Sequence, residues 1–298
     1  MTWSNQFREV IPFKYFYLVC RDAIDAVERL LAFLAVTSLF IGGTGFFKTY
    51  MASLLLGIQP SMMICFAVFL VSFSVYTLDK LVDLDRDISN MPARKQFLYS
   101  RRRFFLVLAL SAYLAAALIM VYVRPAALPL VFVPVIANAF YGMRLLPWIP
   151  RLKDIPVMKN VVVGSAWALV TVLIPVFHSG YGSPWALVLY FIFIKTFIDT
   201  VLYDIRDVAG DRISGVRTMP VILGETPTVL VLLILNTTIL PVSLFLPGGS
   251  REIALALTLY GYAYIAYLRR RRNPVVLDML VEGEWMMACV ALYLLNAL

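Results

Sequence analysis

Long apolar runs, separated by short polar and basic stretches, make up most of this chain. A helix of roughly 20 apolar residues crosses the hydrocarbon core of a bilayer, which is about 30 Å thick. The sequence is 61% hydrophobic and only 15% charged, which is more apolar than a water-soluble domain. The pattern predicts a single all-α, multi-pass membrane domain over residues 1–298, with about nine transmembrane helices around a central cavity. The nine runs lie near residues 29–46, 53–78, 104–123, 126–143, 160–178, 184–203, 227–246, 252–268 and 275–297.

The basic residues fall on one side of this predicted topology. With the N-terminus placed in the cytoplasm, 22 of the 26 Lys and Arg residues lie in cytoplasmic segments. Cytoplasmic loops carry an excess of Lys and Arg, so the distribution predicts a cytoplasmic N-terminus and cytoplasmic loops at the site described below. The net charge of +8 therefore reflects membrane topology and does not indicate nucleic-acid binding. Residues 1–28 suit an interfacial helix on the cytoplasmic surface and, equally, a basic flank of the first run.

A row of carboxylates ends the second apolar run. The sequence YTLDKLVDLDRD covers residues 76–87, and its Asp79, Asp83 and Asp87 recur every four residues. On a helix these side chains lie along one face, where their like charges repel. A divalent cation takes oxygen ligands from several carboxylates at once and removes that repulsion. The row therefore predicts a metal site, and a magnesium ion with open positions would in turn bind a phosphate.

The sixth run ends in a second row of acids. Asp204, Asp207 and Asp211 are spaced i, i+3 and i+7, on one helical face at the same cytoplasmic side, about 120 residues after the first row. We expect the two rows to face each other and metal ions between them to bridge to a diphosphate. Within the run, Lys195 and Asp199 are four residues apart, and an ion pair between them is the simplest way to hold both charges in lipid.

Basic and polar residues in the neighbouring segments are candidates for contacts with the phosphates. Arg94 follows the first acidic row, and Arg144 and Lys153 follow the fourth run. Guanidinium and ammonium groups neutralise phosphate charge. Asn138 and Tyr141 share a helical face with Arg144, so they are expected to line the cavity, although Asn138 equally suits a contact between helices.

The cysteines, the histidine and the remaining charged residues in the apolar runs indicate less about function. The three cysteines are far apart and His178 is the single histidine, so neither a disulfide framework nor a multi-histidine metal site is expected. Lys48 is placed in a short loop between the first two runs. Asp278, Glu282 and Glu284, near the start of the last run, are expected at a solvated helix end, within reach of the site only as a second possibility.

With both acidic rows assigned, the chain resembles the UbiA-type intramembrane prenyltransferases. The first family pattern, Asn or Asp followed by two Asp at four-residue intervals, corresponds to Asp79, Asp83 and Asp87. The second pattern, DxxxD followed by Arg, Gly and a basic residue before Pro, corresponds to Asp207, Asp211, Arg212, Gly215, Arg217 and Pro220, with Asp204 at a polar position just before it. Two departures stand out: Asp79 replaces the Asn of many members, and Tyr141 with Arg144 only approximates the family's tyrosine-to-lysine motif.

The resemblance implies magnesium-dependent transfer of a prenyl group from an isoprenyl diphosphate to a hydrophobic acceptor in the membrane, with two Mg²⁺ ions expected. The acceptor is either an aromatic ring, as in quinone biosynthesis, or a glycerol-phosphate lipid, as in ether-lipid biosynthesis. The implied metal ligands are Asp79, Asp83, Asp87, Asp207 and Asp211. The implied substrate contacts are Arg94, Asn138, Arg144, Lys153 and Asp204, and Asp79, Tyr141 or Asp199 is expected to orient the acceptor or accept its proton.

Two other classes remain open. A cation-coupled transporter also uses intramembrane acids, but transporters tend to place them near the midplane and often show inverted repeats, whereas these acids lie at helix ends. An alcohol phosphatidyltransferase also uses membrane aspartates, but in one contiguous motif, and it ranks third. The sequence identifies no protein partner.

Overall fold

The computed structural model is helical throughout the part of the chain that it describes, namely residues 33–34, 37–83, 99–142, 155–180, 184–213, 215–268 and 274–297. The elements are α2 Leu39–Leu55, α3 Met62–Asp83, α5 Arg102–Val123, η1 Pro125–Ala127, α6 Leu128–Val131, α7 Val133–Gly142, α8 Met158–Ala168, η3 Leu169–Leu173, α9 Ile174–Ser179, α10 Trp185–Ile213, α11 Met219–Leu223, α12 Glu225–Leu244, α13 Ser250–Leu268, α14 Pro274–Val281 and α15 Glu284–Ala297. The all-α prediction is confirmed.

Five helical stretches within these residues are long and apolar enough to cross a membrane. They are Met62–Val82, Arg102–Val123, Met158–Ser179, Trp185–Ile213 and Glu225–Leu244. Each overlaps one of the predicted runs, because an apolar stretch of this length satisfies its backbone hydrogen bonds within one helix. The bounds differ most for the second run, which was predicted to begin at 53 but begins at Met62, and for the sixth, whose helix continues to Ile213. The total of nine spans stays a prediction.

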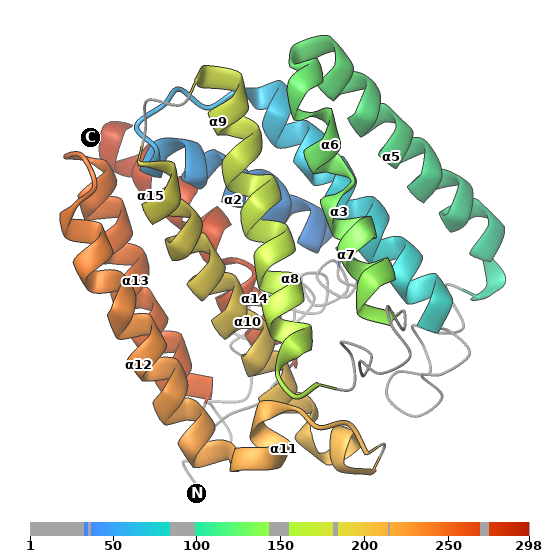
Figure 1. Cartoon of the computed structure of the whole chain (residues 1–298), viewed down its shortest axis with the longest axis vertical. Helices are drawn as coiled ribbons and strands as arrows, with labels where there is room; N and C mark the ends of the chain where they lie inside the picture. Colours follow the sequence, from blue (N-terminus) through green and yellow to red (C-terminus); the bar gives the residue numbers. More distant parts are fainter. Residues whose placement is uncertain are drawn as a thin grey trace, which may run out of the picture.

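The helices run alternately up and down the bundle (Figure 1). In this view α3, α7, α10 and α13 end near the lower end, where α5, α8 and α14 begin. Contacts pass from α2 to α3 and α5, through α6 and α7 to α8, and on through α10, α12 and α13 back to α2. The two helices that carry the acidic rows therefore end on the same side of one closed bundle.

Prolines and a glycine divide several of the predicted runs. Pro134 has no N–H to donate to the carbonyl four residues earlier, and the fourth run is split into η1, α6 and α7. Pro175 likewise cannot donate to the carbonyl of Thr171, and the turn before it, η3, is π-helical. Gly283 separates α14 from α15 at a point where a Cβ would collide with the carbonyl of Met279.

The predicted loop around Lys48 is wrong. Lys48 lies inside α2, which continues to Leu55, and its side chain is only 7% exposed. The turn comes later, at Gly57, whose φ of 70° is a conformation that glycine adopts without strain. The hydrophobicity pattern predicted that the first apolar run ends before Lys48. In the folded protein, buried partners on α10 allow the charge of Lys48 to remain within the helix.

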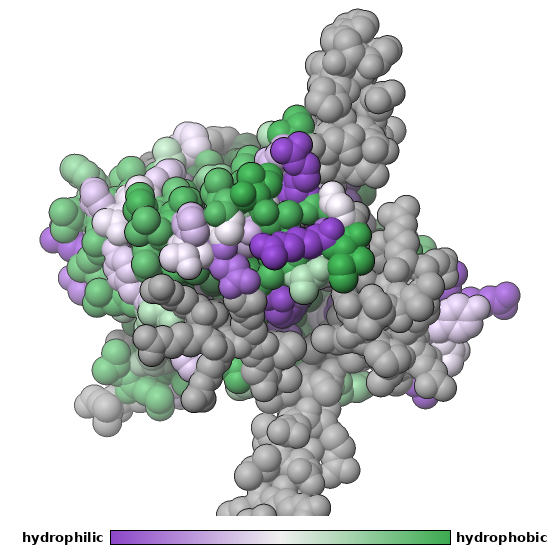
Figure 2. Space-filling model, turned by 90° about the horizontal axis from the view of Figure 1, so that it is seen from below, coloured by the Kyte–Doolittle hydropathy of each residue, from purple (hydrophilic) through white to green (hydrophobic). Residues whose placement is uncertain are grey.

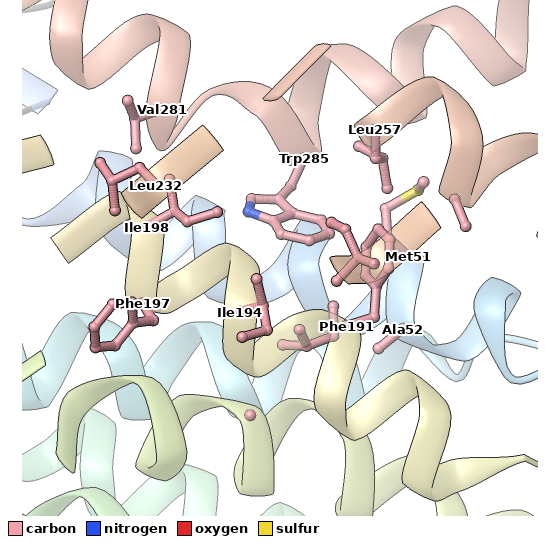
Figure 3. Packing of buried hydrophobic residues seen from close by; sticks show 14 of the residues in the cluster. Met51, Ala52, Phe191, Ile194, Phe197, Ile198, Leu232, Leu257, Val281 and Trp285 are labelled. Atoms are coloured by element: carbon pink, nitrogen blue, oxygen red, sulfur yellow. The ribbon is translucent and has the colours of Figure 1, made fainter. Parts of the chain in front are cut away.

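The largest apolar core cluster lies where α2, α10, α12, α13 and the last helices meet. Trp285 is its largest fully buried side chain. Figure 3 shows the indole of Trp285 with Met51 of α2, Phe191 and Ile194 of α10 and Leu257 of α13 around it. The first residues of α15 are therefore part of the bundle interior.

A buried ion pair crosses this core. The Lys195 Nζ lies 2.6 Å from the Glu284 Oε1, and the two side chains are 0% and 1% exposed. Lys195 also donates to the carbonyl of Leu257 at 3.1 Å and to the hydroxyl of Tyr264 at 3.0 Å. The predicted Lys195 pair with Asp199 and the predicted solvated position of Glu284 are both wrong, because Glu284 lies closer in space although it is 89 residues away in the sequence.

We expect Glu284→Ala to destabilise the bundle by about 3–5 kcal/mol, because it leaves the Lys195 ammonium buried without a counter-charge. Thermal unfolding of the purified protein in detergent measures this loss as a lower Tm. The double variant Lys195→Met with Glu284→Leu removes both charges and should recover most of the stability. An unchanged Tm in Glu284→Ala would contradict the assignment.

Candidate functional site

A pocket lies inside the bundle between the two helices that carry the acidic rows. We call it the inner pocket. Side chains of α2, α3, α8, η3 and α10, together with the turn before α15, line it. The lining residues are Ile41, Thr44, Gly45, Lys48, Ser72, Tyr76, Trp167, Thr171, Thr196, Asp199, Thr200 and Glu282. It is thus mostly polar on the α2 and α10 sides, and aromatic where α3 faces α8.

The inner pocket lies just inward of both acidic rows. Tyr76 precedes Asp79 by three residues, which is about 4.5 Å along a helix axis. Asp199 precedes Asp207 by eight residues, or about 12 Å. A ligand bound between the acidic helix ends would therefore extend its more deeply buried end toward this pocket.

The first acidic row is described only in part. Asp79 lies exposed in the last turns of α3, and α3 ends at Asp83. The side chain of Asp83 and all of Asp87 and Arg94 lie outside the described residues, as do Arg144 and Lys153. Their predicted roles stay predictions.

In the second row, Asp204 is buried and held on both carboxylate oxygens. The Lys159 Nζ lies 3.2 Å from its Oδ1, and the Asn160 Nδ2 donates to its Oδ2 at 2.8 Å. Both partners come from the first turn of α8. These contacts of Asp204 hold the first turn of α8 against the C-terminal half of α10. Asp207 and Asp211, the other acids of the row, lie on the same half of α10.

Asp207 and Asp211 have more open surroundings than Asp204. Arg206 donates to both oxygens of Asp207 at 2.8 Å, and the Asp207 side chain is 47% exposed. Asp211 accepts a hydrogen bond at 3.1 Å from the hydroxyl of Thr218, in the segment leading into α11. These carboxylates are oriented but not enclosed, as groups that bind a soluble ligand must be.

The other predicted residues on this side lie on α7. Asn138 is exposed and Tyr141 is half-buried. Neither lines the inner pocket, so the structure leaves their predicted contact with substrate untested. Figure 2, the view from below, shows hydrophilic side chains in purple among hydrophobic ones in green on this face of the bundle.

Carboxylate oxygens are the ligands that Mg²⁺ prefers, and the donor set at these helix ends suits it. Across the described residues, no three Asp, Glu, Cys or His side chains gather into a preformed metal cluster. Asp83 and Asp87, two of the five predicted ligands, are outside the side chains compared. The described acids fit a metal that is shared with a phosphate ligand, which supplies the remaining oxygens.

The contacts made by Lys48 were not predicted from the sequence pattern. Its Nζ donates to the hydroxyl of Thr196 at 3.1 Å, lies 4.0 Å from the Asp199 Oδ2 and sits 5.3 Å from the ring centre of Trp285. Asp199 also accepts a 3.4 Å hydrogen bond from Tyr264. Asp199 is therefore placed at the inner pocket, paired with a lysine from another helix.

Solved structures of similar fold exist. A UbiA homolog from Aeropyrum pernix K1, in its apo form, matches with a TM-score of 0.61 and 17% identity over 86% of this chain and 98% of that one. A UbiA homolog from Archaeoglobus fulgidus bound to GPP and Mg²⁺ matches with a TM-score of 0.55 and 14% identity over 87% and 98%. The same homolog bound to DMAPP and Mg²⁺ gives the same TM-score and identity over 87% and 97%.

Comparison with curated protein sequences finds no match. The model of the UbiA prenyltransferase family, in contrast, matches residues 30–276, which include both acidic rows and most of the bundle. The fold of the solved homologs agrees with that match. The chain belongs to the UbiA prenyltransferase family.

Proposed function

We propose that the protein transfers a prenyl group from an isoprenyl diphosphate to a hydrophobic acceptor within the membrane, in a magnesium-dependent reaction. The observation that carries the proposal is a single pocket lined by Tyr76 of α3 and Asp199 of α10, just inward of the acidic ends of both helices. Family membership and solved homologs bound to GPP or DMAPP with Mg²⁺ support it.

The diphosphate is assigned to the acidic helix ends. Asp79, Asp83, Asp87, Asp207 and Asp211 would hold two Mg²⁺ ions, which when bound neutralise the leaving diphosphate. Arg94, Arg144 and Lys153 are proposed to bind its remaining charge, since guanidinium and ammonium groups pair with phosphate oxygens. The excess of Lys and Arg in the loops supports assigning this end of the bundle, and the N-terminus, to the cytoplasm.

Asp204 is assigned a positioning role in place of direct contact with substrate. Both of its oxygens already have partners on α8. A buried carboxylate with two donors keeps a fixed orientation, because losing either hydrogen bond is costly. It holds α10 so that Asp207 and Asp211 face the diphosphate.

The inner pocket is proposed to shelter the reaction. The allylic C–O bond breaks, the diphosphate leaves with the electron pair, and prenyl C1 bonds to the acceptor, whose proton passes to the Asp199 carboxylate. Tyr76 and Trp167 stack with ring centres 5.6 Å apart, and aromatic faces stabilise a nearby cationic carbon. The position of the pocket inside the bundle would limit the access of water, which would otherwise capture the cation. Asp79 and Tyr141 remain alternatives to Asp199 in this role.

We expect Asp207→Asn and Asp211→Asn each to lower prenyl transfer by about 100-fold or more, since several kcal/mol of charge stabilisation would be lost. The assay follows diphosphate release and product mass with purified protein, Mg²⁺, geranylgeranyl diphosphate and a panel of phenols and glycerol-phosphate acceptors. Chelation of Mg²⁺ should stop both signals, and its return should restore them.

Glu252→Gln serves as the matched control, because Glu252 is an exposed acid at the opposite end of the bundle. It should retain full turnover. Transfer that persists in chelator, or in both Asp variants, would contradict the proposal, and magnesium-independent cation flux in vesicles would favour a transporter.

The positioning role of Asp204 leads to a separate expectation. Asn160→Ala removes the 2.8 Å hydrogen bond to Asp204 and should lower stability by about 1.5–3 kcal/mol, the value of a hydrogen bond to a charged group. It should also raise the KM for the prenyl diphosphate, because α10 loses its fixed position. Asn236→Ala, which removes another buried Asn hydrogen bond between α12 and α13, should lower the Tm without raising that KM. Equal KM changes in both variants would argue against the role.

A further inference from the structure

We propose that the inner pocket is the acceptor subsite, and that it selects a neutral head group that donates a hydrogen bond and disfavours an anionic one. This inference rests on the proposed function, because it names the substrate class for the second half of the same reaction. It is carried by the charges and the unpaired polar atoms that line the pocket.

The one lysine that lines the pocket is already compensated. Lys48 pairs with Asp199 at 4.0 Å, donates to Thr196 at 3.1 Å and lies 5.3 Å from the centre of the Trp285 ring. An aromatic face is a further attractive surface for its ammonium. Among the described lining residues, therefore, no unpaired positive charge faces the pocket.

Lys195, which precedes the lining residue Thr196 on α10, is bound to other partners. Lys195 contacts Glu284 at 2.6 Å, together with the carbonyl of Leu257 and the hydroxyl of Tyr264, and it is not among the lining residues. Glu282, in contrast, lines the pocket beside Asp199. The described lining thus holds two carboxyl groups and one lysine that is already paired, so burial of a further anion there would lack a counter-charge.

Two buried polar atoms at the pocket have no hydrogen-bond partner among the described residues. They are the Asp199 Oδ2 and the Ser72 Oγ, and the two residues are 3% and 1% exposed. A buried polar atom left without a partner costs free energy that a ligand can recover. A carboxylate oxygen only accepts, so the ligand must donate, and a hydroxyl group can satisfy both atoms.

The walls of the pocket are packed closely on one side and flat on the other. Gly45 of α2 leaves room for the Ser72 side chain of α3, because a Cβ at Gly45 would collide with it. Across the pocket, the rings of Tyr76 and Trp167 lie nearly parallel, at 9°. A neutral head group with one hydroxyl, such as a phenol or a primary alcohol, matches the chemistry of a flat aromatic wall beside the Asp199 carboxyl and the Ser72 hydroxyl.

The test compares two probes of similar shape, 4-hydroxybenzyl alcohol and 4-hydroxybenzoate. Their affinities for the purified full-length protein in nanodiscs, with Mg²⁺ and a non-hydrolysable prenyl diphosphate analogue, are measured by saturation-transfer NMR. We expect the alcohol to bind at least about tenfold more tightly, which corresponds to 1.4 kcal/mol. Equal or tighter binding of the carboxylate, or no binding of the alcohol, overturns the proposal.

Variants separate the pocket charge from general stability. Asp199→Asn should reduce the preference to within about twofold, because the Lys48 charge is then free to attract the carboxylate. Glu252→Gln, which removes an exposed carboxylate that does not line the pocket, should keep the preference. Ser72→Ala changes no charge and should weaken binding of the alcohol by about threefold to tenfold, the value of one neutral hydrogen bond. If Asp199→Asn does not fold, the affinity of the alcohol for Ser72→Ala tests whether the inner pocket is the acceptor subsite.

Diphosphate release and probe affinity together distinguish failure of the acceptor assignment from failure of the proposed function. Magnesium-dependent diphosphate release with preference for the carboxylate probe would overturn the acceptor assignment alone. Loss of diphosphate release in the unmodified protein would overturn the proposed function, and the acceptor assignment with it.

Discussion

Charge inside an apolar bundle must be neutralised by partners from other helices, and this constraint organises the structure. Lys195 of α10 meets Glu284 of α15, while Lys48 of α2 meets Asp199 of α10. Tyr264 of α13 joins the two pairs through hydrogen bonds to Lys195 and Asp199. Removing one member would leave an uncompensated charge in a medium that cannot solvate it, so four helices are held in one arrangement.

The acids of the chain therefore divide into two groups with different uses. Those in the interior, such as Asp199 and Glu284, face lysines of other helices and help to hold the bundle together. Those at the helix ends, Asp79 and Asp207 among them, are exposed or half-exposed at the surface of the bundle. Asp204 lies between the groups, since it belongs to the second row by spacing but is buried against α8. The boundary between the groups lies at the inner pocket, where a reaction that needs both charge and shelter from water is best placed.

The sequence predicted much of this arrangement because its strongest signals are local. Uninterrupted apolar runs set the helices, and the spacing of Asp204, Asp207 and Asp211 placed them on one side of α10. The family resemblance, which depended on these spacings, is confirmed by the family match. Orientation across the membrane and the metal ligands stay predictions.

Ion-pair partners that are far apart along the chain could not be predicted from the sequence. Lys48 was placed in a loop because a lysine within an apolar run normally marks its end, and only the folded bundle supplies Asp199 and Thr196 beside it. Lys195 was paired with its neighbour in sequence, whereas the preferred partner, Glu284, comes from the other end of the chain. Both errors have one cause. A charge buried in the bundle pairs with an opposite charge that is close in space, whatever the separation of the two residues in the sequence.

The central claim is that the acidic helix ends hold the diphosphate of the donor through shared metal ions. The most direct measurement replaces Mg²⁺ with Mn²⁺ and records ³¹P electron–nuclear double resonance with a non-hydrolysable prenyl diphosphate analogue bound. We predict ³¹P couplings of directly coordinated phosphate in the unmodified protein. Bound Mn²⁺ without such coupling, or no Mn²⁺ bound in the presence of the analogue, would contradict the claim.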